Sequence, residues 1–147
     1  MAQLTDITAI LVATVNLFAG ALGAWAWWRG EAGRGFWAAV RAGQAATSLL
    51  AILAAVLLVS GFDAPDDLLY LYMLLPITVS IIAEQLRVAS AQTVLDQRGL
   101  EDAKAVAQLP EDRQHDIVWA IVRREAGVMT VAALVIAFLA LRVLANT

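Results

Sequence analysis

The sequence predicts an all-α fold: a polytopic transmembrane four-helix bundle whose third and fourth helices extend into the cytoplasm as a hairpin. Of the 147 residues, 61% are hydrophobic, and the mean hydropathy is +0.74. An ordinary soluble domain has an apolar content of roughly 45–50%, so lipid must be the solvent for much of this chain. In addition, two long helical segments change between apolar and polar without a helix-breaking residue, at residues 81–98 and 115–127. We therefore treat residues 1–147 as a single integral membrane domain.

The first two predicted transmembrane helices cover residues 5–28 and 36–59. The first has no charged residue between Asp6 and Arg29, and at about 1.5 Å per residue it can cross a hydrocarbon layer of roughly 30 Å. It ends in tryptophans followed by an arginine, which is typical of an anchor at the membrane interface. The glycine-rich link between the two helices is short, so they should be antiparallel neighbours.

Small residues recur at every fourth position of the second predicted helix. Such spacing is expected to place them on one face, where another backbone can approach closely. The partner is either another helix of this chain or a second copy, and the sequence leaves both open. The row consists of Ala39, Gly43, Thr47, Ala51 and Ala55.

The remaining transmembrane helices are predicted at residues 67–97 and 111–145. Gly99 is a plausible C-cap for the first of them, and Pro110 with two following acids suits the opening turn of the second. A short helix at about 100–108 separates them. Residues 84–125 then form a hairpin that projects from the membrane surface.

The positive charges predict the orientation in the cell membrane. Nine of the ten lysines and arginines lie on the side of the first and third links, and only Arg142 lies on the other. The positive-inside rule counts lysine and arginine, so this multi-pass protein is expected to have both termini on the extracytoplasmic side.

Charged residues at the base of the hairpin are predicted to share one depth at the inner leaflet. One interpretation is a set of interfacial ion pairs, with Glu84 paired to Arg123 or Arg124. The other is a site for anionic lipid headgroups or ions, because guanidiniums form forked bonds to phosphate. The candidate residues are Glu84, Gln85, Arg87, Arg123, Arg124 and Glu125.

Three polar residues are candidates for a cavity that extends this layer toward the middle of the membrane: Asn16, Gln44 and Thr130. Asn16 has an alternative interpretation as an interhelical hydrogen bond.

Composition excludes several classes of function. The chain has no cysteine and one histidine, His115, so neither thiolate chemistry nor a histidine-rich metal site is expected. Catalytic residues, a metal and a cofactor are therefore not predicted. A net charge of −3 argues against nucleic acid as a partner.

The sequence favours a small, non-catalytic accessory or interaction protein. Its expected partners are membrane lipids and either further copies of itself or another component of a membrane complex. The alternative is a small transporter or channel in which Glu84 is the coupling carboxylate.

Overall fold

The protein is built from helices throughout the part of the chain that the structure describes. This structure, a computed structural model, describes residues 2–63, 66 and 68–146. Its helices are α1 (Ala2–Arg29), α2 (Arg34–Val59), α3 (Leu68–Gln97), α4 (Ala103–Ala107) and α5 (Glu111–Leu144). The predicted all-α fold class is confirmed. Asp67, the predicted first residue of the third transmembrane helix, lies outside the described residues.

Within the described residues, the four long helices are each long and apolar enough to cross a membrane. They are α1, α2, α3 and α5, as the sequence predicts. Many large apolar side chains remain exposed on their outer surfaces, such as Phe18, Ile52 and Phe138. In water such surfaces would be costly, whereas lipid solvates them. The protein is thus a small helical bundle of the multi-pass membrane class.

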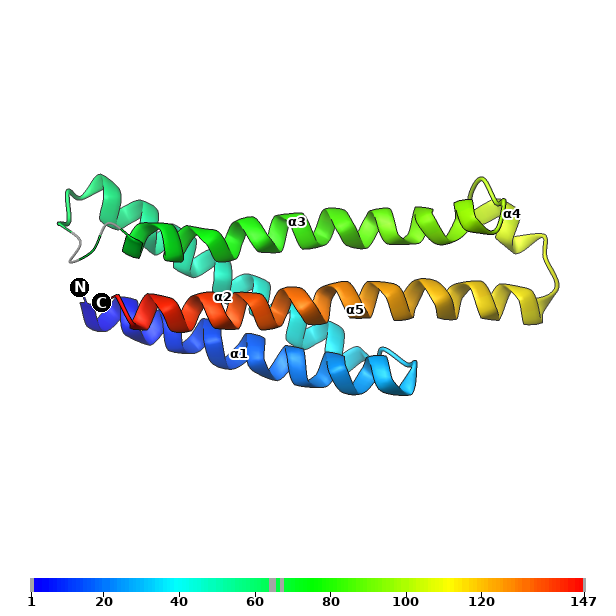
Figure 1. Ribbon diagram of the computed structural model, residues 1–147, viewed down its shortest axis with the longest axis horizontal. Helices are drawn as coiled ribbons and strands as arrows, with labels where there is room; N and C mark the ends of the chain where they lie inside the picture. The colour runs from blue at the N-terminus through cyan, green and yellow to red at the C-terminus, as the bar shows by residue number, and fades with distance from the viewer. Residues whose placement is uncertain (1, 64–65, 67, 147) are drawn as a thin grey trace.

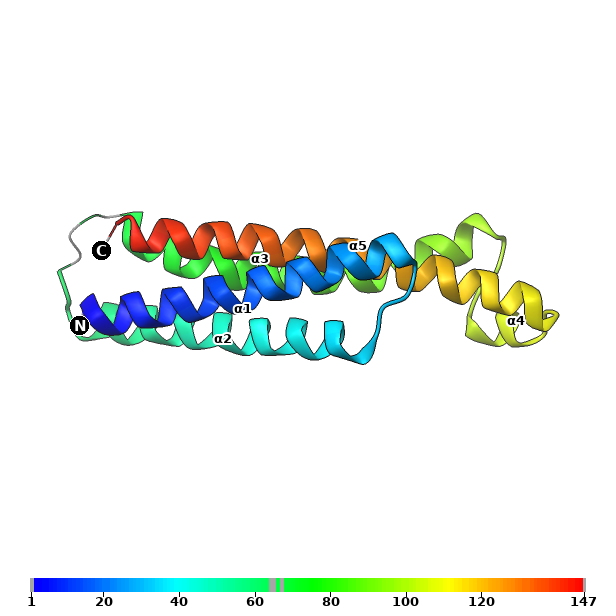
Figure 2. The ribbon, with the colours of Figure 1, turned by 90° about the horizontal axis from the view of Figure 1, so that it is seen from below.

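The long helices alternate in direction around the bundle (Figures 1 and 2). α1 packs against α2 and α5, while α3 packs against α2 and α5. The start of α1 and the end of α5 lie at the same end of the molecule, which we call the terminal end. α3 and α5 continue beyond α1 and α2 at the opposite end, where α4 joins them.

The core changes in character along the bundle. Toward the terminal end it contains large side chains, including Leu50, Leu57 and Met73. Nearer the hairpin it contains Phe36 and Met129 among many alanines. Small residues allow the helices to approach closely where lipid gives no driving force for association.

The row of small residues on α2 divides between two environments. Ala39, Gly43 and Thr47 are buried, whereas Ala51 is half-buried and Ala55 is exposed. The expectation that all five share one face was wrong, because four residues advance about 40° beyond a full turn of 3.6 residues. Over four steps this drift reaches about 160°. The buried face continues instead through Leu50, Ala54 and Leu57.

Gly43 lies at a close contact between α2 and α1. A Cβ atom at this position would lie 2.7 Å from Oδ1 of Asn16. At Gly43 the row therefore packs within the chain, against α1.

The hairpin has its own small core. Val94, Leu95 and Ile117 are buried there, and side chains from α4 and its flanking turns pack on them. α3 ends at Gln97 and is followed by Gly99, which has a φ of 67°, and the N–H of Leu100 donates to the carbonyl of Leu95 at 3.0 Å. This is a Schellman C-cap, for which glycine is the favoured residue.

The tip of the hairpin is stabilised by side-chain bonds to the backbone. Asp102 caps α4 by accepting the N–H of Ala105 at 2.9 Å. The capped helix, Ala103–Ala107, is shorter than the predicted 100–108. Gln114 of α5 donates to the carbonyl of Leu109 at 2.7 Å. The hairpin is consequently an ordered extension of α3 and α5.

Candidate functional site

A layer of charged and polar side chains crosses the bundle where the hairpin begins. We call this set the charge layer, and it comprises Arg41, Gln44, Glu84, Arg87, Arg123, Arg124 and Glu125. Its members come from α2, α3 and α5. The α1–α2 link lies near the same level along the bundle, because Gly30 of the link packs against Trp119 of α5.

Glu84 is the centre of the α2–α3 side of this layer. Its Oε1 accepts hydrogen bonds from Arg41 at 2.9 Å and from Gln44 at 2.6 Å. Its Oε2 accepts from Nε of Arg87 at 2.8 Å. The carboxylate is only 27% exposed, and both of its oxygens are engaged by donors. This arrangement satisfies the charge of a partly desolvated carboxylate.

Helix geometry explains why α2 supplies two of these partners. Arg41 and Gln44 are three residues apart and therefore lie on one face of α2. They also bond to each other, with Nη1 of Arg41 donating to Oε1 of Gln44 at 2.6 Å. This pair presents two donors to Glu84, so Arg41 belongs to the site. From the sequence it was one of the nine positive charges that predict the orientation.

The expected pairing of Glu84 with Arg123 or Arg124 was wrong, since Glu84 pairs with Arg41 and Arg87. Glu125 lies 4.0 Å from Arg87, so α5 reaches the network only through a long ion pair. Gln85 is exposed to the surroundings of the bundle.

Arg123 and Arg124 have different surroundings from the other arginines of the layer. Both are exposed, and neither forms an ion pair with any carboxylate in the described part of the chain. The guanidinium carbon of Arg123 lies 5.3 Å from the ring centroid of Trp27 and 5.1 Å from that of Trp119. Two cation–π contacts thus hold its charge without neutralising it.

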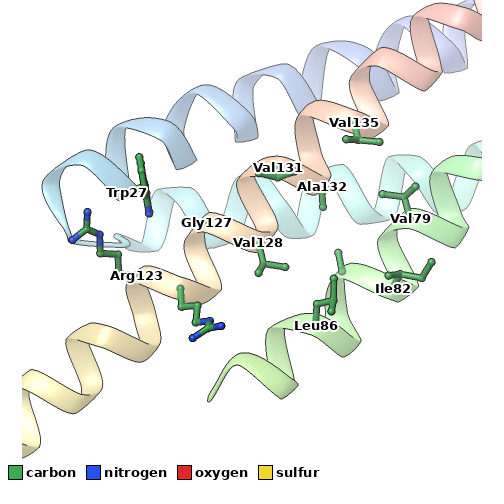
Figure 3. Close-up of a pocket in the computed structure, with 12 residues that line it drawn as sticks. Trp27, Val79, Ile82, Leu86, Arg123, Gly127, Val128, Val131, Ala132 and Val135 are labelled. Carbon is green, nitrogen blue, oxygen red and sulfur yellow. The ribbon is translucent and has the colours of Figure 1, made fainter. Parts of the chain in front are cut away.

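An open apolar groove runs from these two arginines along α3 and α5 (Figure 3). We call it the lateral groove. Its volume is about 540 Å³. Val79, Ile82 and Leu86 of α3 face Val128, Val131 and Val135 of α5 across it. Trp27 and Arg123 lie together at the hairpin end of the groove.

Only two of the three predicted cavity residues lie together. Asn16 and Gln44 line a small cavity of about 10 Å³, together with Ser80 of α3. This is about the smallest space that holds one water molecule. The side-chain amide of Asn16 also donates to the carbonyl of Val12 at 2.9 Å.

Thr130 lies elsewhere in the bundle. It packs against Gly23 of α1, and its hydroxyl donates to the carbonyl of Ala126 at 2.6 Å. Its side chain therefore forms part of the close α1–α5 contact.

No group of three or more histidine, cysteine, aspartate or glutamate residues within 2–63, 66 and 68–146 has a geometry that could hold a metal ion.

Comparison with known proteins gives no relative from which to transfer a function: no family model, no curated protein and no solved structure matches the chain.

Proposed function

We propose that this protein is a non-catalytic accessory component of the cell membrane that presents its hairpin to a cytoplasmic partner. The observation that carries the proposal is the ordered projection of α3 and α5 beyond α1 and α2 (Figure 1). A hairpin with its own core and a capped tip offers a defined surface at a set distance from the membrane. Both chain termini would lie on the extracytoplasmic side, as the positive-inside rule predicts.

The charge of the tip favours a partner with a basic surface. We define the hairpin tip as residues 96–116. It has six exposed acids against three exposed bases, which gives a net charge of −3: Asp96, Glu101, Asp102, Glu111, Asp112 and Asp116 against Arg98, Lys104 and Arg113. None of these acids forms an ion pair within the described residues. Complementary charge would therefore guide and orient a basic partner.

The surroundings of Glu84 support an accessory function over transport. A coupling carboxylate must exchange its proton or ion with water during the transport cycle. Glu84 instead has donors on both oxygens, and the nearby cavity of about 10 Å³ is lined by Gln44 but not by Glu84.

Sidedness is tested by cysteine labelling in intact cells. The chain has no native cysteine, so Asp63→Cys and Lys104→Cys each introduce a single thiol. A membrane-impermeant maleimide should label the cysteine at position 63 and leave the one at 104 unmodified until the cells are opened. The reverse pattern would place the hairpin outside and contradict a cytoplasmic partner.

Docking is tested by site-specific photocrosslinking in cells. A photoreactive residue at Lys104, on the exposed tip, should give a discrete crosslinked product. The same probe at Val59, which is 90% exposed near the terminal end, is the control and should not give that product. Charge reversal with Glu101→Lys and Glu111→Lys should abolish the product, whereas Asp63→Lys should leave it unchanged.

The mass of the product distinguishes the partner classes. A product of twice the mass of the chain would identify a second copy at the tip, which contradicts a basic partner because two acidic tips repel each other. A product that survives the double charge reversal would also exclude charge-guided docking.

A further inference from the structure

We propose that the lateral groove binds one anionic phospholipid from the leaflet at the hairpin end, with an acyl chain in the groove and its phosphate at Arg123 and Arg124. This inference goes beyond the docking of a partner at the hairpin tip. It requires the membrane location of the bundle, but it does not depend on any partner of the hairpin.

The first support is the difference in pairing between the arginines of the charge layer. Arg41 and Arg87 are bonded to Glu84, so each has a carboxylate partner within the protein. Arg123 and Arg124 have no such carboxylate in the described part of the chain. Guanidiniums with available N–H groups are suited to forked, charge-assisted bonds with phosphate oxygens.

The tryptophans position Arg123 without consuming its hydrogen-bond donors. Trp27 and Trp119 attract the guanidinium through their ring faces, and a ring face does not neutralise a cation as a carboxylate does. Indoles also favour the depth of the lipid headgroups. The side chain is therefore held at the mouth of the groove with its charge available to a ligand.

The groove has the dimensions of one leaflet. It extends along α5 from Arg124 to Val135, which at 1.5 Å per residue is roughly 17 Å. Half of a hydrocarbon layer of roughly 30 Å is about the same length. Apart from the arginines at its mouth, the lining is apolar and includes the small residues Ala83, Gly127 and Ala132. An extended acyl chain fits such a channel, whereas a polar solute would lose its hydration there.

The charge distribution at this level selects an anionic headgroup. Six arginines lie in the charge layer or at the helix ends beside the α1–α2 link. Against the three glutamates of these regions they give a local net charge of +3: Arg29, Arg34, Arg41, Arg87, Arg123 and Arg124 against Glu31, Glu84 and Glu125. The hairpin tip beyond it carries −3. A positive layer beneath a negative tip attracts anionic lipid and keeps the tip away from the same membrane surface.

A second copy is a poorer occupant of this groove. A symmetric dimer through the α3–α5 face would bring the same surface of both chains together. Arg123 and Arg124 of one chain would then lie at the same depth as those of the other. Like-charge juxtaposition of this kind opposes assembly.

The test measures lipid binding to the full-length protein in detergent. Native mass spectrometry during titration with phosphatidylglycerol or phosphatidylcholine should show one retained phosphatidylglycerol per chain, bound at least about tenfold more tightly than phosphatidylcholine. Equal retention of both lipids would overturn the anionic selectivity. Competition by inorganic phosphate at the same concentration as the lipid would overturn the requirement for the acyl chain.

Two variants test the headgroup and the chain separately. Arg123→Gln with Arg124→Gln should lose phosphatidylglycerol retention about tenfold or more. Arg34→Gln is the matched control, because Arg34 is exposed at the start of α2, beside the α1–α2 link, and lies outside the groove. Val131→Trp should fill the groove and displace the lipid although both arginines remain. Leu17→Trp, at an exposed position of α1 outside the lateral groove, is its control.

Circular dichroism and size-exclusion profiles check that each variant remains folded. Retention of phosphatidylglycerol by either the double arginine variant or Val131→Trp, at the wild-type level, would overturn the proposed site. Crosslinking from position 104 should persist in both variants. Failure of the lipid site is therefore distinguishable from failure of hairpin docking.

Discussion

The arginines of the charge layer occupy two contrasting regions of the molecule. On the α2–α3 side, Arg41 and Arg87 are bonded to Glu84 within 2.9 Å. On the α3–α5 side, Arg123 and Arg124 face an open groove and lack a carboxylate partner among the described residues. These four arginines lie at the same level of the bundle, but only the first two are paired with a carboxylate of the protein.

The difference suggests how structural and functional charge can be distinguished in a membrane bundle. A carboxylate with both oxygens bonded stabilises helix packing and has little capacity for another ligand. A guanidinium held by aromatic rings keeps its donors for an external anion. Changes on the first side should therefore affect stability, whereas changes on the second should affect binding more than stability.

The largest effect is expected from Gly43→Leu, which disturbs the α1–α2 contact next to the Glu84 network. The new side chain would overlap Asn16 and push α2 away from α1, moving the adjacent Gln44 relative to Glu84. Overfilling a close contact should lower the free energy of unfolding by about 3 kcal/mol. A denaturing-detergent titration followed by circular dichroism measures this loss.

Ala55→Leu is the matched control for Gly43→Leu. Ala55 belongs to the same four-residue row but is exposed, so the substitution should leave the free energy of unfolding nearly unchanged. Equal losses in the two variants would mean that the exposed end of α2 is also a packed contact, as it would be in an oligomer.

Glu84→Gln should have the next largest effect, because it removes the shared counter-charge of Arg41 and Arg87. Breaking a fully buried pair costs about 3–5 kcal/mol, whereas a fully exposed pair contributes about 0–1 kcal/mol. Glu84 is 27% exposed, so we expect a loss of about 2 kcal/mol in the same titration.

The double variant Glu84→Gln with Arg87→Gln sharpens that measurement. Removing the stranded guanidinium should restore part of the stability, giving a clear coupling energy in a double-mutant cycle. Strictly additive losses would show that the two side chains do not act as a pair. Pairing Glu84→Gln with Arg124→Gln is the control cycle, and it should be additive.

The sequence predicted the fold well because membrane spanning depends on length and hydropathy. The extents of the four long helices follow from apolar runs bounded by charges, glycines and prolines, all of which are local features. Gly99 likewise acts through a local backbone conformation. These features require no knowledge of which helix packs against which.

The candidate site was predicted less well because depth along a helix does not determine the direction in which a side chain points. The rise per residue placed Glu84, Arg124 and Glu125 at a common level. Rotation about the helix axis depends on tertiary packing, and in the structure Glu84 meets Arg41 of α2. The spacing of Arg41 and Gln44 was the available signal for that partner.

A smaller effect is expected on the unpaired side from Arg123→Gln. The substitution removes contacts with Trp27 and Trp119, and a cation–π contact at an exposed site contributes about 0.5–1 kcal/mol. The loss of unfolding free energy should be about 1 kcal/mol, with partial recovery in Arg123→Lys. A loss as large as that of Glu84→Gln would show that Arg123 stabilises the fold as strongly as Glu84 does. The α3–α5 side of the layer would then not differ from the α2–α3 side in its contribution to stability.

The smallest effect is expected from Glu125→Gln, which lies between the two regions. Its carboxylate is 17% exposed and 4.0 Å from Arg87, whose guanidinium already bonds Glu84. The long ion pair contributes little, and the neutral amide avoids the cost of desolvating a charge. These terms oppose each other, so the free energy of unfolding should change by less than about 0.5 kcal/mol.

The change should add to that of Glu84→Gln in a double-mutant cycle, because the coupling across Arg87 is weak. A loss near 2 kcal/mol, or strong coupling to Glu84, would instead show that Glu125 of α5 belongs to the paired network. The boundary between paired and unpaired charges would then separate Glu125 from Arg123 and Arg124.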